Sequence, residues 1–67
     1  MPSPNAPAAG HALAILTLLA RRATPVPAAT IARELGLPRS STYHLLAVLV
    51  EHGYAVHLPS GAVRRGG

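Results

Sequence analysis

The sequence predicts a mainly α-helical domain of three helices followed by a small β-hairpin. Three observations lead to this fold class. Apolar residues recur at helical spacing in three consecutive segments. Proline and glycine separate those segments, and the last part of the chain carries short strand-like runs around a Pro-Ser-Gly turn. Residues 1–9 hold three prolines and no periodic pattern, so we expect a disordered tail there, followed by one domain over residues 10–66.

The first helix is expected over residues 10–22, which contain good helix formers and no proline. Leu13 and Leu18 lie off its expected buried face, so this helix is apolar nearly all round. Arg21 and Arg22 fall in its last turn, where cations suit the helix dipole, and two prolines then end it. The expected buried face consists of Ala12, Ile15, Leu16 and Leu19.

The second and third helices are each expected to open on a proline, because proline is well tolerated at the first helical position. The second spans residues 27–35 and stops at Gly36; the third spans residues 38–52 and stops at Gly53. Their expected buried faces are Ala28, Ile31, Ala32 and Leu35 in the second helix, and Thr42, Leu45, Leu46 and Leu49 in the third.

The remaining residues predict a hairpin. Residues 54–58 form a short strand, residues 59–61 form the turn, and residues 62–65 return as the second strand.

Composition excludes several classes of protein. The 67 residues contain no cysteine, so disulfide frameworks and thiolate chemistry are ruled out. With only two carboxylates, paired-acid catalysis is nearly impossible. The four histidines show no metal-ligand spacing, and we expect no enzyme activity, metal or cofactor. The apolar run over residues 12–20 is too short to cross a bilayer, so we expect a cytoplasmic protein without membrane contact.

The spacing of the second and third helices is the most informative feature. A connection of about three residues containing glycine is typical of a helix-turn-helix, in which the second helix places its N-terminal residues in the DNA major groove. The following hairpin is then a wing. With six arginines and a net charge of +4, the chain suits a polyanionic partner. The candidate DNA-binding residues are Arg39, Ser40, Ser41, Tyr43 and His44 on the third helix, Arg33 on the second, and Arg64 and Arg65 on the wing.

Simpler interpretations of these residues remain open. Arginines on small domains are often only solvated charges, and Arg33 and Glu34 fit an exposed face. Tyr43 could cover the turn instead of touching DNA, while Ser40 and Ser41 could serve as first-turn caps.

A family resemblance rests on the stretch ATIARELGLPRSSTYHLLAVLVEHGYAV, residues 29–56. Its elements LGLPRSST, HLLAVL and EHGY, together with the preceding ALAILTLLA, resemble the DNA-binding domain of IclR-type bacterial transcriptional regulators over roughly residues 10–66. The resemblance implies a winged helix-turn-helix that binds double-stranded DNA at palindromic operators as a homodimer. It also implies that the protein is a repressor located at the nucleoid. In the family a larger C-terminal domain, absent from this chain, binds the small-molecule effector.

Dimer pairing in the family involves the first helix, which points to Leu13, Leu16 and Leu18 as interface residues because a small monomer cannot cover an all-round apolar helix. Four positions depart from the family pattern. His44 stands where arginine is usual, Val63 where a wing tyrosine is common, and Arg65 where an apolar residue is common. Val26-Pro27 replaces a polar helix cap.

An alternative function is a winged-helix protein–protein interaction or dimerisation module without DNA binding. The apolar first helix favours this hypothesis as much as it favours a DNA-binding dimer. Salt separates the two, because DNA binding weakens steeply as salt rises and an apolar interface does not.

Overall fold

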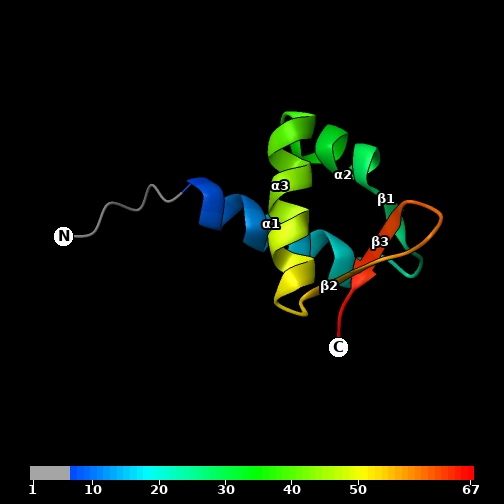
Figure 1. The fold of residues 1–67 in the computed structure, drawn as a ribbon. Coiled ribbons are helices and arrows are strands. Elements are labelled where there is room, and N and C mark those ends of the chain that lie inside the picture. The colour runs from blue at the N-terminus through cyan, green and yellow to red at the C-terminus, as the bar shows by residue number, and fades with distance from the viewer. Residues whose placement is uncertain (1–6) are drawn as a thin grey trace.

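Three helices and three short strands make up residues 7–67, the part of the chain that the computed structural model describes (Figure 1). In chain order they are α1 (Pro7–Arg21), β1 (Val26–Pro27), α2 (Ala28–Leu35), α3 (Arg39–Glu51), β2 (Ala55–His57) and β3 (Ala62–Arg65). The predicted fold class is confirmed: α2 and α3 form a helix-turn-helix, and β2 and β3 form the wing beside it.

The first helix begins earlier than the sequence pattern indicates. We expected a disordered tail over residues 1–9, but Pro7 opens α1 and residues 7–9 are helical. Proline needs no amide hydrogen in the first helical turn, and the alanines that follow favour a helix, so the pattern extends to Pro7. Residues 1–6 lie outside the described part of the chain.

The sheet contains one strand more than the predicted hairpin. Its order is β1-β3-β2, with β3 antiparallel to both neighbours. Val26 pairs with Val63, and Pro27, which we expected to be the first residue of the second helix, is the second residue of β1. Proline is tolerated there because β1 is an edge strand and needs no further amide donor. A strand of two residues leaves no periodic pattern, which explains why the sequence did not predict it.

The core forms where α1, α2, α3 and the sheet meet. Fully buried side chains come from each layer: Ile15 from α1, Ile31 from α2 and Val63 from β3. Contacts join α1 to α2, α3 and β3, so the first helix supports both the helix-turn-helix and the wing. The other buried hydrophobic residues are Leu19, Val26, Ala32, Leu46, Leu49 and Ala55.

Both helices of the helix-turn-helix end in the same backbone motif. At the end of α2, Gly36 adopts the left-handed conformation with φ 67°, its amide donates to the Arg33 carbonyl at 3.3 Å, and the Leu37 amide donates to Ala32 at 2.9 Å. At the end of α3, Gly53 has φ 82° and the Tyr54 amide donates to the Leu49 carbonyl at 2.8 Å. These are Schellman motifs, which satisfy terminal carbonyls and turn the chain sharply.

The last strand closes against the end of α3 at Gly66. The Gly66 amide donates to the Tyr54 carbonyl at 2.9 Å. A Cβ atom placed on Gly66 would lie 2.4 Å from the Gly53 carbonyl oxygen and 3.1 Å from the Ala55 nitrogen. Both neighbours are backbone atoms, so neither can rotate away. This close approach holds the end of β3 against the end of α3.

Gly66→Ala is therefore expected to lower the free energy of unfolding by about 1–3 kcal/mol, the usual cost of forcing an extra methyl into a tight contact. Urea denaturation followed by circular dichroism measures the change. Gly10→Ala is the matched control, because Gly10 is helical with no neighbouring atom within 4 Å of its added Cβ. The control is expected to gain about 0.5–1 kcal/mol. Equal stability of the Gly66 variant and the wild type would contradict the packing argument.

Candidate nucleic-acid interface

The first turn of α3 presents polar side chains to solvent. Arg39, Ser40 and Ser41 are exposed, as are Tyr43 and His44 in the next turn. Thr42 alone in this stretch points inward, with 0% of its surface exposed. Helical geometry explains the division, because Thr42, Leu46 and Leu49 share the face that packs on the core while the residues between them turn outward.

The start of α3 is anchored by Pro38 and Thr42. Pro38 stands at the N-cap position with φ −59° and ψ 144°, and its carbonyl accepts two hydrogen bonds from Thr42, one from the amide and one from the side-chain Oγ1, each at 3.0 Å. No side chain caps the helix. The first amides of α3 therefore remain available to an anion, which the helix dipole also favours.

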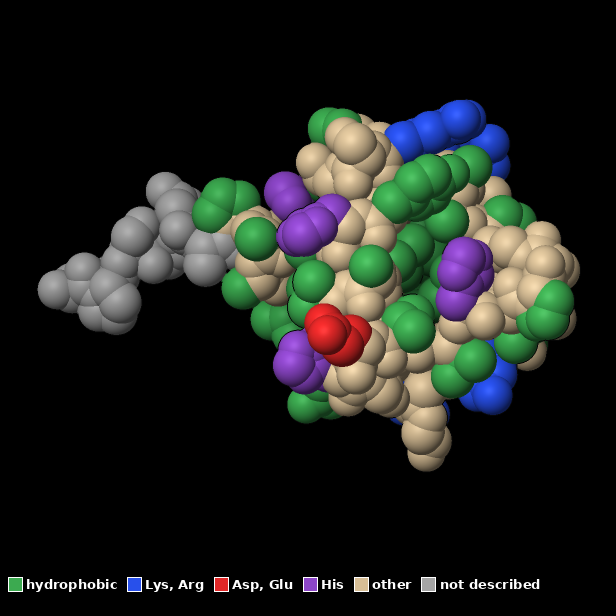
Figure 2. Space-filling model, viewed as in Figure 1, with side chains coloured by type: hydrophobic (Ala, Val, Ile, Leu, Met, Phe, Trp, Pro, Cys, Tyr) green, Lys and Arg blue, Asp and Glu red, His purple; other side chains and the backbone are tan. Residues whose placement is uncertain are grey.

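The candidate DNA-binding arginines occupy two separate places, the helix-turn-helix and the wing. Arg33 lies exposed near the end of α2, next to the turn that leads into α3. Blue side chains gather over α2 and the start of α3 in the space-filling view (Figure 2). Arg64 and Arg65 lie on β3, where they pair with Val56 and Ala55, just after the end of α3. A helix of this length spans roughly 20 Å, so the structure does not bring the wing arginines next to Arg39.

The wing arginines also sit at the base of the hairpin and not at its tip. The tip is the turn over residues 58–61, closed by the Gly61 amide donating to the Leu58 carbonyl at 2.9 Å. Arg64 alternates with the buried Val63, which places it on the outer face of the sheet, and its Nη1 donates to the Arg65 carbonyl at 3.1 Å. Arg65 lies on the same face as Val63 but at the end of the strand.

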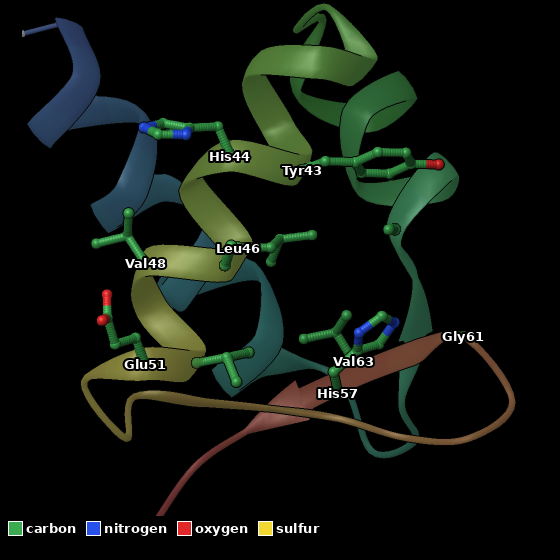
Figure 3. Close-up of a pocket in the computed structure, with 11 residues that line it drawn as sticks. Tyr43, His44, Leu46, Val48, Glu51, His57, Gly61 and Val63 are labelled. Carbon is green, nitrogen blue, oxygen red and sulfur yellow. The ribbon is translucent and has the colours of Figure 1, made fainter.

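A groove separates α3 from the wing (Figures 2 and 3). Its volume is about 990 Å³, and its floor is apolar, with Leu46, Ala47 and Val50 from α3 and Val63 from β3. Tyr43, which is 49% exposed, stands on the α3 side. Tyr43 therefore borders this groove.

Neither carboxylate disturbs the first turn of α3. Glu34 accepts a salt bridge from Arg22, which joins the start of the α1–β1 connection to α2. The sequence pattern indicated only an exposed Arg33–Glu34 face, because a partner so distant along the chain cannot be recognised from periodicity. Glu51 ends α3, far from Arg39. The end of α3 that carries Arg39 is thus basic without a competing acid.

The three predicted dimer residues differ in how much of each side chain is exposed to solvent. Leu13 is 64% exposed, whereas Leu16 and Leu18 are partly buried against the core. The apolar surface that α1 offers to a second copy is therefore smaller than the sequence indicates. Their role in a dimer stays a prediction.

Metal-ligand clusters and membrane-spanning helices are two features that would indicate other kinds of site among residues 7–67. No group of three or more His, Asp or Glu side chains in this part of the chain could hold a metal ion. No helix within it has the length and apolar character needed to cross a membrane.

Comparisons with known proteins agree with this geometry. A sequence model of the IclR helix-turn-helix domain matches residues 8–65, which is most of the chain. The chain belongs to the IclR family. A comparison with curated protein sequences finds no match.

The IclR-family domain is also similar to a solved structure, the repressor BlcR of Agobacterium tumefaciens, with a TM-score of 0.84 and 38% sequence identity. The match covers 96% of this chain and 26% of the BlcR chain. The domain thus has the winged helix-turn-helix fold of the IclR family.

Thr42→Val tests whether the Thr42 hydroxyl holds the start of α3. The variant keeps the buried shape and loses one hydrogen bond, and the Pro38 carbonyl keeps its bond from the Thr42 amide. We expect the free energy of unfolding to fall by about 1 kcal/mol. Thermal denaturation measures it, with Thr17→Val as the control because Thr17 is exposed on α1. The same change in both variants would remove the special role of Thr42.

Proposed function

We propose that this IclR-family domain binds specific double-stranded DNA as a homodimer on a palindromic operator, and that it belongs to a repressor. The observation that carries the proposal is the first turn of α3: Arg39, Ser40 and Ser41 are exposed beside uncapped helix amides, with no carboxylate nearby. The similarity to BlcR, a repressor, supports repression as the regulatory role. In this proposal a small-molecule effector acts through a domain outside these 67 residues.

Sequence selection is assigned to the beginning of α3. The major groove admits an α-helix, and an arginine there forms paired hydrogen bonds with guanine O6 and N7. Arg39 is the candidate for this contact. Ser40, Ser41 and His44 offer shorter donors to base edges or phosphates on the same exposed surface.

Affinity is assigned to phosphate contacts on either side of α3. Arg33 lies near the connection to α3 and suits the DNA backbone on that side. Arg64 and Arg65 lie near the other end of α3 and suit phosphates flanking the bases that α3 contacts. Contacts of this kind position the domain without selecting sequence.

Dimerisation is assigned to α1, with Leu13 at the centre of the contact and Leu16 and Leu18 at its edge. A twofold pair would place two recognition helices about 34 Å apart, one turn of DNA, which matches a palindrome. The exposure of Leu13 supports this assignment.

The alternative is a protein–protein interaction module. The apolar groove beside α3 and the exposed Leu13 are the observations that favour it. Both surfaces bind through apolar area, so the affinity of such a module would respond little to salt.

A binding selection tests the proposal. The chain is incubated with a random-sequence duplex pool at low salt, and the retained duplexes are sequenced and rebound at higher salt. The proposal expects a palindromic sequence whose affinity falls steeply with salt. Retention without sequence preference would contradict specific binding, and no retention at any salt would favour the protein–protein alternative.

Arg39→Ala and Arg65→Ala should weaken DNA binding in different ways. The first is expected to cost about 1–3 kcal/mol on the selected duplex and to relax the choice of one base, because a base contact is lost. The second should weaken all duplexes alike and reduce the salt slope by about 1. Fluorescence anisotropy with single-base variants of the duplex distinguishes them. Arg21→Ala, which removes equal charge from the cleft between α1 and α2, is the control.

Leu13→Gln should dissociate the dimer without unfolding the monomer, because Leu13 is largely exposed. Sedimentation velocity over a range of concentrations gives the oligomeric state, and circular dichroism checks the fold. We expect at least a tenfold weaker dimer, which is about 1.4 kcal/mol of lost apolar contact. A variant that dimerises as the wild type does would move the interface away from α1. Ala20→Gln, exposed near the C-terminal end of α1, is the control.

A further inference from the structure

The sheet lies beside the helices, and its outer face is unusually apolar for a surface in contact with solvent (Figure 1). An antiparallel sheet that packs one face on a core commonly presents polar side chains on the other face. In this domain the buried Ala55 and Val63 mark the inner face of β2 and β3. Neighbouring residues of a strand point to opposite faces, so Val56 and Arg64, which pair across the two strands, lie on the outer face.

Three rows of side chains cross the outer face from β2 to β3. Val56 and Arg64 form the middle row. The row toward the turn holds Leu58 and Ala62, which are joined by a hydrogen bond of 2.9 Å from the Leu58 amide to the Ala62 carbonyl. At the other end, Tyr54 continues the alternation of β2. These residues, together with the residue of β1 that pairs with Ala62, are named the outer sheet face: Tyr54, Val56, Leu58, Ala62, Arg64 and Pro27.

Solvent reaches the apolar part of the outer sheet face. Tyr54 is 58% exposed, Pro27 is exposed, and the three other apolar residues are half-buried. Cross-strand neighbours on one face lie about 5 Å apart, so these side chains form a continuous patch around Arg64. A contiguous exposed apolar patch with a polar group in it is typical of a contact site for another molecule.

Arg64 determines the charge that a partner of this face must carry. Its Nη1 donates to the Arg65 carbonyl at 3.1 Å, and no carboxylate of the described residues pairs with it. Glu34 is bound to Arg22, and Glu51 lies at the end of α3. An apolar surface that covered Arg64 without an acid would bury an uncompensated charge, which is costly. The complementary partner therefore has an apolar surface that carries one carboxylate.

The length of the outer sheet face matches a short helix. From Tyr54 to Leu58 the chain rises about 13 Å, at about 3.3 Å per residue. A helix of about nine residues has the same length, because each residue adds about 1.5 Å. Helices with one apolar stripe are the elements that cover sheet faces in layered folds. A carboxylate near the middle of such a stripe would lie opposite Arg64.

We propose that the outer sheet face docks a short amphipathic helix of another protein, which places one carboxylate of its apolar stripe against Arg64. Neither carboxylate of a second copy suits this role, because Glu34 is paired with Arg22 and Glu51 lies on the helix assigned to DNA. A DNA phosphate is the competing partner of Arg64. The apolar surroundings favour a protein, since surfaces that bind DNA are more polar and more positively charged than this face.

The docking site is separate from the proposed DNA contacts on α3. The inner face of the sheet packs on the core, so the outer sheet face points away from α3. The first turn of α3 therefore stays accessible when a helix covers Val56 and Tyr54. Docking does not depend on DNA binding, and it can be tested without DNA.

A displayed library of helical peptides tests the proposal on the full 67-residue chain. Each peptide has about 14 residues, the length at which isolated helices become stable, with alanine and glutamine outside one stripe. Within the stripe, positions i, i+3, i+4 and i+7 vary among leucine, phenylalanine, glutamate, lysine and glutamine. Peptides that the wild type retains are sequenced, and fluorescence anisotropy gives their dissociation constants.

The wild type should retain peptides that combine one glutamate with leucine or phenylalanine in the stripe. Arg64→Glu should bind them about tenfold more weakly, and replacing the peptide glutamate by lysine should restore its binding, because both charges are then reversed. Tyr54→Gln should also bind about tenfold more weakly, since an aromatic contact is lost. Tyr54 and Arg64 are both exposed, so both variants should fold, which circular dichroism checks.

Two control variants change the same chemistry elsewhere on the domain. Arg21→Gln removes a positive charge from the cleft between α1 and α2. Val48→Gln removes an apolar side chain that is 38% exposed on α3. Both should bind the retained peptides as the wild type does.

Four results would overturn the proposal. Retention of no peptide would show that the face docks no helix of this chemistry. Peptide affinities that stay the same in Arg64→Glu and Tyr54→Gln would place the contact elsewhere. A loss of duplex affinity in Arg64→Glu without a change in peptide affinity would assign Arg64 to a phosphate. Self-association of the wild type that Arg64→Glu abolishes, measured by sedimentation velocity, would assign the face to a second copy.

The outcome is distinguishable from that of the proposed DNA-binding function. If the chain binds no duplex but retains the acidic peptides through Arg64, docking stands and the proposed function fails. If it binds a palindromic duplex but no peptide, the proposed function stands and docking fails.

Discussion

The left-handed backbone at Gly36 determines how α3 is presented. The Schellman bonds around it end α2 within a single residue, and Pro38 then restarts the chain as the N-cap of the next helix. Because α2 and α3 cross at this short connection, the inner face of α3 packs on Ile31 and the core while its first turn stays in solvent. Any residue with a side chain at Gly36 would strain this conformation, and the exposed polar turn would lose its fixed direction.

The small core leaves little stability to spare, so single contacts matter. Four elements share a few fully buried side chains, and many of the remaining apolar residues are alanines that bury little area. Backbone contacts between elements add to this small core: β3 pairs with both neighbouring strands, and Gly66 approaches the end of α3 closely. Thr42 adds the one fully buried polar side chain of the described residues, and its hydroxyl is hydrogen-bonded. These features connect the wing, α3 and α1 through packing and backbone contacts.

The distribution of charge follows from a very small number of acids. One carboxylate is paired with Arg22 and the other lies at the end of α3, so the positive groups near the first turn of α3 are unopposed. A basic surface of this kind attracts a polyanion over a Debye length. The apolar groove between α3 and the wing carries no arginine on its lining.

Several features could be predicted from the residues alone because they depend on local rules. Helical periodicity and the Pro and Gly signals located three helices and the hairpin, and the motif LGLPRSST indicated a family that the comparisons confirm. The helix bounds were less accurate: α1 begins at Pro7, and Pro27 lies in a strand. The ends of helices depend on a few backbone hydrogen bonds, and the pattern of residues specifies those bonds only weakly.

Tertiary packing decided the rest, because it joins residues that are distant along the chain. A strand as short as β1 exists only because Val63 lies beside Val26, and the charge of Glu34 is compensated only because Arg22 reaches it. The same packing covers Leu16 and Leu18 in part and places Arg64 and Arg65 at the base of the wing. The sequence by itself determined which side chains the domain carries and which helix presents them. The three-dimensional structure alone decided which of them face one another, since that depends on long-range contacts that periodicity does not contain.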